Sequence, residues 1–256
     1  MRLRRTPRPM PGIGAKLRAA GGAPFTRLHL DLGCGKGTYL VEQARREPDT
    51  LFIGMDQEPI CIAYAAQKIC EQGLSNALVL PRGAASLPQL FAAGELDAIT
   101  INFPTPQPKA KYAKKRLVHV DHLMLYRPLF SAGATVTLRT DSKPLRDYAL
   151  GQFAAAGYDT LWVSDDVRRD HPKHPETEYE RRTREMGAVV YGICATPGAH
   201  PSDDVLTAGH MQEQSLACYL PDNLDELTYV PLGMEEAVEN FKNRARKGKK
   251  RLPQES

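Results

Sequence analysis

Residues 28–37 read Leu-His-Leu-Asp-Leu-Gly-Cys-Gly-Lys-Gly, an apolar run that passes directly into three closely spaced glycines. The helical pattern Thr-Tyr-Leu-Val-Glu-Gln-Ala-Arg-Arg follows at once, at residues 38–46. A buried strand, a glycine-rich turn and a helix in this order are typical of the opening of a nucleotide-binding α/β sheet. The stretch therefore predicts an α/β fold whose glycine turn lies at the ligand-binding edge of the sheet.

The spacing of the glycines distinguishes between classes of nucleotide cofactor. A dinucleotide fingerprint, Gly-x-Gly-x-x-Gly, needs its third glycine at position 38, where the chain has Thr38. The chain instead has Gly33, Gly35 and Gly37, with Asp31 two residues before the first of them. This pattern resembles the S-adenosylmethionine (SAM) loop of class I methyltransferases. Glycines there let the backbone pass close to the ligand, and the carboxylate pairs with the methionine ammonium.

A second carboxylate ends the next apolar run. Residues 51–56 read Leu-Phe-Ile-Gly-Met-Asp, so Asp56 follows the glycines by about 20 residues. Nucleotide-binding sheets place a carboxylate at this distance on the ribose hydroxyls, and an ordinary surface aspartate after a strand is the alternative. The expected SAM-binding residues are therefore Asp31, Gly33, Gly35, Gly37 and Asp56.

Strand and helix patterns alternate along the rest of the chain. Strands are predicted at 77–80, 97–103, 134–139, 158–164 and 187–195, and helices at 59–73, 86–93, 117–129, 144–156 and 235–251. This alternation predicts a Rossmann-like fold, with a mostly parallel central sheet and helices on both faces. Ligands of such sheets bind beyond the carboxyl ends of the strands. We therefore expect the glycine loop and the loop after the strand at 97–103 to lie on the same rim.

Composition limits the class of protein. The chain has 256 residues, 42% of them hydrophobic, which suits one globular domain with extensions. No apolar run approaches the ~20 residues of a membrane span, and the N-terminus lacks an apolar signal core, so we expect a cytoplasmic protein without membrane contact. The five cysteines form no Cys-x-x-Cys pair and are expected to be reduced thiols. His171 and His174 have a metal-like spacing but no nearby cysteine, so no metal site is predicted.

Charge divides the chain into three parts. Residues 1–27 hold seven Arg or Lys and no acidic residue, and residues 242–256 hold seven Arg or Lys and one acidic residue. The whole chain has a net charge of +4, so the part between these ends is acidic. Basic ends favour a polyanionic partner, although tails that only aid solubility are the alternative. We divide the chain into a basic segment with little order (1–25), a catalytic domain (26–196) and an extension with a basic tail (197–256).

A second basic stretch follows the strand at 97–103. Residues 103–116 read Phe-Pro-Thr-Pro-Gln-Pro-Lys-Ala-Lys-Tyr-Ala-Lys-Lys-Arg. Prolines restrict the backbone and so reduce the entropy lost on binding, while cations neutralise phosphates and a tyrosine stacks on bases. The alternative is the solvated start of a helix. The expected RNA-binding residues are Lys109, Lys111, Tyr112, Lys114, Lys115 and Arg116.

Taken together, these stretches resemble the bacterial tRNA (guanine-N7)-methyltransferases. The resemblance extends from about Leu28 to Thr196. It is carried by Leu-Asp-Leu-Gly-Cys-Gly-Lys-Gly at 30–37, Phe-Ile-Gly-Met-Asp at 52–56, Glu-Gln-Gly-Leu-Ser-Asn at 71–76, the Pro-x-Pro and basic run at 104–116, Thr-Asp at 140–141 and Thr-Glu-Tyr-Glu at 177–180. The last stretch looks like the family's Thr-x-Phe/Tyr-Glu substrate motif.

The resemblance implies an enzyme that uses SAM to form N7-methylguanosine in tRNA, at the variable-loop guanosine of position 46. It places Asp31 and Asp56 at the cofactor and residues 111–116 on the RNA. The residues it places at the substrate guanosine are Lys109, Asp141, Thr177 and Glu180. Asp141 and Glu180 are also expected to act in catalysis, by stabilising the charge that passes to the purine ring.

Two departures from the family pattern bear on activity. The family's Pro-Asp-Pro-Trp is Pro-Thr-Pro-Gln at residues 104–107, so its acidic residue and its aromatic residue are both missing. Thr105 stands in place of the aspartate and is expected to act in catalysis, by accepting a hydrogen bond from the guanine amino group. Gly83 aligns with an acidic residue near the adenine, where its backbone N–H remains able to contact the base. Two alternatives therefore stay open: a methyltransferase of this family with a different RNA target, or an RNA-binding relative that has lost catalysis. The oligomeric state is not indicated.

Overall fold

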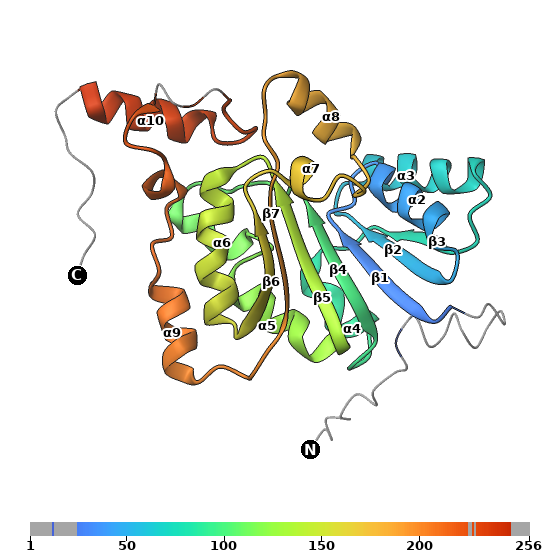
Figure 1. The fold of residues 1–256 in the computed structure, drawn as a ribbon. Coiled ribbons are helices and arrows are strands. Elements are labelled where there is room, and N and C mark those ends of the chain that lie inside the picture. Colours follow the sequence, from blue (N-terminus) through green and yellow to red (C-terminus); the bar gives the residue numbers. More distant parts are fainter. Residues whose placement is uncertain (1–11, 13–24, 225–226, 228, 247–256) are drawn as a thin grey trace, which may run out of the picture.

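The computed structural model describes residues 12, 25–224, 227 and 229–246 (Figure 1). The prediction of little order in segment 1–25 falls almost entirely outside the described residues, as does the basic tail beyond residue 246. Within the described residues, no helix combines the length and the apolar character that crossing a bilayer requires.

The centre of the fold is a seven-stranded sheet with the order β3-β2-β1-β4-β5-β7-β6. Its strands are β1 (Arg27–Leu32), β2 (Thr50–Met55), β3 (Ala77–Leu80), β4 (Leu96–Asn102), β5 (Phe130–Thr140), β6 (Tyr158–Ser164) and β7 (Tyr191–Pro197). Neighbouring strands from β3 to β5 pair in parallel, and β7 lies antiparallel between β5 and β6. The predicted mostly parallel sheet is confirmed.

Helices cover the sheet on both sides, as Figure 1 shows. The helices α2 (Thr38–Arg46) and α3 (Pro59–Glu71) pack together on one side, and α4 (Leu87–Leu90), α5 (Val120–Tyr126) and α6 (Lys143–Ala155) on the other. Local signals explain their ends. Pro59 occupies the first turn of α3, and the side chain of Ser142 caps α6 by accepting a hydrogen bond from the N–H of Leu145 at 3.3 Å.

Several elements differ from their predicted extents. The helix predicted at 117–129 is shorter, because Pro128 has no N–H to continue it, and a 3₁₀ turn (Arg127–Leu129) follows α5. The second half of the basic stretch forms another 3₁₀ helix (Ala110–Lys115). The predicted strand at 187–195 begins only at Tyr191. The helices α7 (Val167–Asp170) and α8 (Glu178–Glu185) were not predicted, although Thr-x-x-Glu at 177–180 is a capping-box sequence.

The C-terminal extension (197–256) packs against the helices that cover the sheet. Its helix α9 (Asp203–Met211) and the 3₁₀ helix Leu216–Tyr219 lie on α6, and α10 (Glu235–Arg246) follows them. The buried side chains of Leu216, Leu220, Met234 and Val238 belong to the main hydrophobic core. The extension is therefore part of the same folded unit as the sheet.

Candidate functional site

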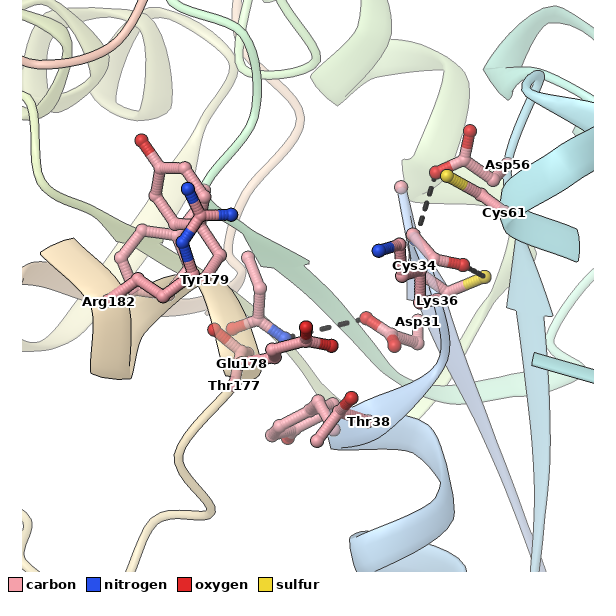
Figure 2. Close-up of a pocket in the computed structure, with 15 residues that line it drawn as sticks. Asp31, Cys34, Lys36, Thr38, Asp56, Cys61, Thr177, Glu178, Tyr179 and Arg182 are labelled. Atoms are coloured by element: carbon pink, nitrogen blue, oxygen red, sulfur yellow. Dashed lines mark hydrogen bonds between the residues drawn. The ribbon is translucent and has the colours of Figure 1, made fainter. Parts of the chain in front are cut away.

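Parallel pairing brings the carboxyl ends of β1, β2 and β4 to one edge of the sheet. Asp31 of β1 lies beside Gly54 of β2 and Thr100 of β4. Beyond these ends is a cavity of about 340 Å³, which we name the glycine-loop cavity. It is lined by the glycine loop, the ends of β2 and β4, and the start of α8. Figure 2 shows Tyr179 and Arg182 of α8 across from Asp31 and Asp56.

The carboxylate of Asp31 is the most unusual group of this cavity. Its side chain is 1% exposed, and Oδ1 accepts only a long hydrogen bond from the Asn102 amide at 3.5 Å. Among the described residues, its Oδ2 has no hydrogen-bond partner. Burial raises the pKa of this carboxyl to about 7. A buried, unpaired carboxylate oxygen at a cavity fits a cationic ligand group such as an ammonium.

The glycine loop has the backbone that its sequence predicts. Gly33, Gly35 and Gly37 have φ angles of 80°, 52° and 71°, in the left-handed region that favours glycine. A Cβ on Gly37 would lie 2.6 Å from the Cβ of Ala65 in α3, so no larger residue fits there. The Gly35 N–H donates to Oδ2 of Asp56 at 2.9 Å, which joins the loop to the end of β2. The loop therefore lines the cavity with bare backbone.

A larger hollow of about 620 Å³ adjoins the loop, and we name it the rim cavity. Asp56 lines both cavities, and the rim cavity also contains Gly83, Thr105, Lys114 and Lys115. The Gln57 side chain packs against the Gly83 backbone, and a Cβ there would lie 2.2 Å from its Nε2 and would displace it. The structure thus brings together the predicted cofactor residues and the start of the basic stretch.

The loop after β4 holds two residues in an uncommon backbone conformation. Phe103 and Gln107 have φ angles of 48° and 52°, although neither is glycine. The Phe103 N–H donates to the Arg139 carbonyl at 2.7 Å, and its ring lies 5.2 Å from the ring of Tyr179. Such conformations persist where the surrounding structure enforces them, and they are frequent at functional sites. Thr105 lies exposed between these two residues, at the rim cavity.

The structure corrects the prediction that Glu180 acts in catalysis and binds the substrate. Its side chain is fully buried, accepts a hydrogen bond from Arg139 Nη2 at 2.5 Å and pairs with Arg168 on its other oxygen. A carboxylate engaged by two arginines in the interior has no access to a substrate. Glu180 also forms the capping box of α8 with Thr177, whose Oγ1 accepts from the Glu180 N–H at 2.9 Å. Its role is to fix α8, which places Thr177 and Tyr179 at the glycine-loop cavity.

Asp141 is nearly buried, at 7% exposure. Its Oδ2 accepts hydrogen bonds from the hydroxyls of Tyr179 at 2.9 Å and Tyr229 at 2.8 Å. Burial raises the pKa of this carboxyl. Asp141 faces a third hollow of about 290 Å³, the extension cavity, which is partly formed by Tyr219 and Tyr229 of the C-terminal extension. Asp141 does not line the glycine-loop cavity, and its hydrogen bond with Tyr179 links it to a residue that does.

The cations of the basic stretch lie in different environments. Lys114 and Lys115 line the rim cavity, and Lys115 and Lys111 lie over the ring of Tyr112 at 4.8 and 5.0 Å. Lys109 is exposed, and its Nζ contacts a carboxylate oxygen of Glu236 in α10 at 2.8 Å.

Arg116 is the exception, and here the prediction of RNA binding is wrong. Its side chain is 1% exposed and donates to the carbonyls of Pro106, Gln107 and Gln214, while its guanidinium stacks on the ring of Tyr148 at 4.4 Å. The residue fastens the proline loop to the extension instead of facing a phosphate.

Some residues of the glycine-loop cavity were missed in the sequence. Asn102 and Phe103 lie at the end of β4, and Arg182 lies in the second turn of α8. No local sequence pattern indicates that these residues line a cavity. The rings of His171 and His174 stack at 5.3 Å beside Trp162. Among the described residues, no group of three or more His, Cys, Asp or Glu side chains is arranged to hold a metal ion.

The sheet order, the glycine loop and the unpaired Asp31 carboxylate define a class I methyltransferase that uses SAM. Residues 26–193 match the family described as "Putative methyltransferase". Curated relatives include the tRNA (guanine-N(7)-)-methyltransferases of Streptococcus equi subsp. zooepidemicus (31% identical, covering 66% of this chain and 81% of the relative) and Geobacillus thermodenitrificans (34% identical, 64% and 76%). The chain belongs to the tRNA (guanine-N7)-methyltransferase family.

The similarity of this chain to solved structures shows its fold alone. The 16S rRNA methyltransferase KamB superposes with a TM-score of 0.57 at 18% identity, over 73% of this chain and 93% of KamB. The family match ends at residue 193, so the C-terminal extension lies outside it.

Proposed function

We propose that this protein transfers the methyl group of SAM to N7 of guanosine in tRNA, and that the target is the variable-loop guanosine. The observation that carries the proposal is the family match over residues 26–193, because this part of the chain builds the glycine-loop cavity and the rim cavity. The lysines at the rim cavity supply the positive charge that an RNA substrate requires. A tRNA substrate implies a cytoplasmic location.

Three groups of the chain fit the three parts of the cofactor. The unpaired Asp31 carboxylate suits the methionine ammonium, Asp56 suits the ribose hydroxyls, and the bare backbone at Gly83 suits the adenine. When bound, SAM supplies a methyl group activated by its positively charged sulfur. The task of these residues is to hold that methyl group at the edge of the sheet, facing the loop that contains Thr105.

Guanine N7 has a free lone pair and no proton, so the site needs no general base. The protein then acts mainly by orientation, which is worth roughly 7–11 kcal/mol when reacting atoms are held at near-attack distance. The conformation of Phe103 and Gln107 fixes the proline loop beside the glycine-loop cavity. Asp141 supplies negative charge near the purine ring that becomes positive.

Transfer of tritiated methyl from SAM to unmodified tRNA tests this function. We expect N7-methylguanosine after nucleoside analysis, and no labelled product from a transcript in which adenosine replaces the variable-loop guanosine. A different methylated nucleoside would support the alternative of another target within the family. SAM binding without any transfer would support an RNA-binding relative that has lost catalysis.

Thr105→Asp should accelerate methyl transfer. Thr105 is exposed at the rim cavity, so a carboxylate there stays hydrated and needs no new partner. A charged acceptor holds the guanine amino group more firmly than a hydroxyl by about 1–2 kcal/mol, which corresponds to a rate roughly ten- to thirtyfold higher. Single-turnover rates on one tRNA measure the effect. The uncharged variant Thr105→Asn is the control and should stay close to the wild-type rate; equal rates for the Asp and Asn variants would contradict the argument.

Replacing Lys111, Lys114 and Lys115 with alanine should flatten the salt dependence of tRNA binding. Each phosphate contact contributes up to ~0.9 to the slope of log affinity against log salt, so the slope should fall by up to about 2.7. Titrations between low and moderate salt measure it. The matched control removes the same charge from exposed cations outside both cavities: Arg27, Arg45 and Arg169. An equal loss of slope in both variants would show a general charge effect instead of a binding surface.

A further inference from the structure

The C-terminal extension reaches the predicted substrate residues, although it lies outside the part of the chain that matches the family. The Leu216 N–H donates to the carbonyl of Pro108, within the basic stretch, at 3.0 Å. Glu236 pairs with Lys109 at 2.8 Å, and the hydroxyl of Tyr229 lies 2.8 Å from Oδ2 of Asp141. The extension therefore contacts two of the predicted substrate residues, Lys109 and Asp141, directly.

The contact at Asp141 is the most specific of these. Tyr179 from α8 and Tyr229 from the extension both donate to the same carboxylate oxygen, Oδ2. Among the described residues, no side-chain hydrogen bond ends on Oδ1. Two hydroxyl donors on one oxygen fix the rotation of the carboxylate and leave the other oxygen as an acceptor. A guanine presents two N–H donors on its Watson–Crick edge, which suit such an acceptor.

We propose that Tyr229 is a positioning residue for methyl transfer: its hydroxyl orients the Asp141 carboxylate, so that Oδ1 accepts a hydrogen bond from the substrate guanosine. This inference rests on the proposed function. Tyr229 acts through Asp141 and touches no reacting atom. The extension thus adds a component of the substrate site that the family-matched residues lack.

The same contact predicts a pH effect. Burial raises the pKa of Asp141, and the hydrogen bonds from the two tyrosines oppose that rise. Of the other charged groups nearby, Lys143 lines the extension cavity while bonded to Asp147 at 2.6 Å, and Arg139 on β5 pairs with Glu180. Removing the Tyr229 hydroxyl should therefore raise the pKa of Asp141 further. Methyl transfer, which needs the ionised carboxylate in this proposal, should then be lost at a higher pH than in the wild type.

Tyr229→Phe tests the proposal, because it removes the hydroxyl and keeps the ring. With SAM saturating, we expect kcat/KM for tRNA to fall about tenfold at pH 7 and its acidic limb to move to higher pH, while the Kd for SAM stays the same. The matched control is Tyr219→Phe. Tyr219 also belongs to the extension and lines the same cavity, but its hydroxyl donates to the Glu213 carbonyl instead of Asp141. This control should move neither kcat/KM nor the pH profile.

Asp141→Asn supplies a second test. In that background the Tyr229→Phe change should have little further effect on kcat/KM, because both changes break the same arrangement. The proposal would be overturned if the effects of Asp141→Asn and Tyr229→Phe on kcat/KM multiplied in the double variant. It would also be overturned if Tyr219→Phe lowered kcat/KM as much as Tyr229→Phe.

A spectroscopic measurement separates this inference from the proposed function. The ¹³C signal of the Asp141 carboxyl, assigned by its loss in Asp141→Asn, should titrate at higher pH in Tyr229→Phe than in the wild type. An unchanged titration overturns the positioning role even if the wild type methylates tRNA. If the wild type forms no N7-methylguanosine, the proposed function fails by itself, and the substrate part of this inference fails with it.

Discussion

Replacing Asp31 with asparagine should lower the affinity for SAM by roughly a hundredfold. The carboxylate is buried, and its Oδ2 has no partner among the described residues, which supports our proposal that it binds the cofactor ammonium. Losing one partner of a buried charge pair costs about 2–5 kcal/mol, and about 2.7 kcal/mol is a factor of a hundred. Calorimetry measures the change. The surface variant Asp49→Asn is the control and should bind like the wild type.

The same carboxylate makes SAM binding depend on pH. Burial raises the pKa of Asp31 to about 7, so below pH 7 the free protein holds a neutral acid there. The ammonium pairs with the ionised form, and affinity therefore rises with pH. The apparent Kd should fall roughly tenfold between pH 6 and pH 8. The Asp31→Asn variant should bind weakly at both values; a wild-type affinity that does not change over this range would contradict the role of Asp31.

Stability should respond to Asp31→Asn in the opposite direction from binding. The pKa of this group in the folded protein lies above its value in the unfolded chain. Any stability that comes from the neutral acid is present at low pH and is lost as the pH rises through about 7. At pH 8 the variant should therefore unfold at the same temperature as the wild type or slightly higher. A weaker ligand affinity with unchanged stability separates a binding role from a structural one.

Glu180→Ala unfolds the protein at a much lower temperature. It leaves Arg139 and Arg168 without the carboxylate that they share in the interior. Breaking a buried pair by removing one partner costs about 3–5 kcal/mol, and in a chain of this size each kcal/mol lowers Tm by roughly 2–4 °C. Thermal and urea unfolding measure the loss. Since the change also removes a cap from α8, activity should fall together with the folded fraction.

Glu176→Gln is the matched control for Glu180. Glu176 lies two residues before the start of α8 and pairs with Arg184 and Arg181, whose side chains are exposed. Surface pairs contribute about 0–1 kcal/mol, so its Tm should stay close to that of the wild type. If Glu180→Ala instead abolished methyl transfer while leaving Tm unchanged, Glu180 would be a catalytic residue and the structural assignment would be wrong.

In the C-terminal extension, local sequence patterns predict a helix but not the residues that it contacts. The helix predicted at 235–251 begins at Glu235, because apolar residues three to four positions apart among charged ones, such as Val238 and Phe241, are typical of an amphipathic helix. Nothing in that pattern indicates that Glu236 meets Lys109, 127 residues earlier in the chain. Tyr229 has no local signal at all, and its role depends on the fold bringing it to Asp141.

The sequence by itself determined the fold class, the cofactor and the family. These depend on a strand, a glycine turn and a helix within residues 28–46, and such signals are short in range: glycine spacing sets the backbone, and apolar periodicity sets each element. The predicted parallel order follows from the alternation of strands and helices, and β3-β2-β1-β4-β5 obeys it. Asp31 and Asp56 reach the same cavity because both end strands that run in parallel.

Only the tertiary structure decided which charged residues face a ligand. Arg116 and Glu180 have the composition of binding residues, yet both are buried, because residues far away in the sequence cover and pair with them. Lys114 and Lys115, adjacent to Arg116, stay exposed at the rim cavity. Whether a charge meets solvent or the interior depends on the elements that pack over it, and that packing joins segments separated by tens of residues. A sequence pattern specifies the chemistry of a side chain, and the fold specifies its environment.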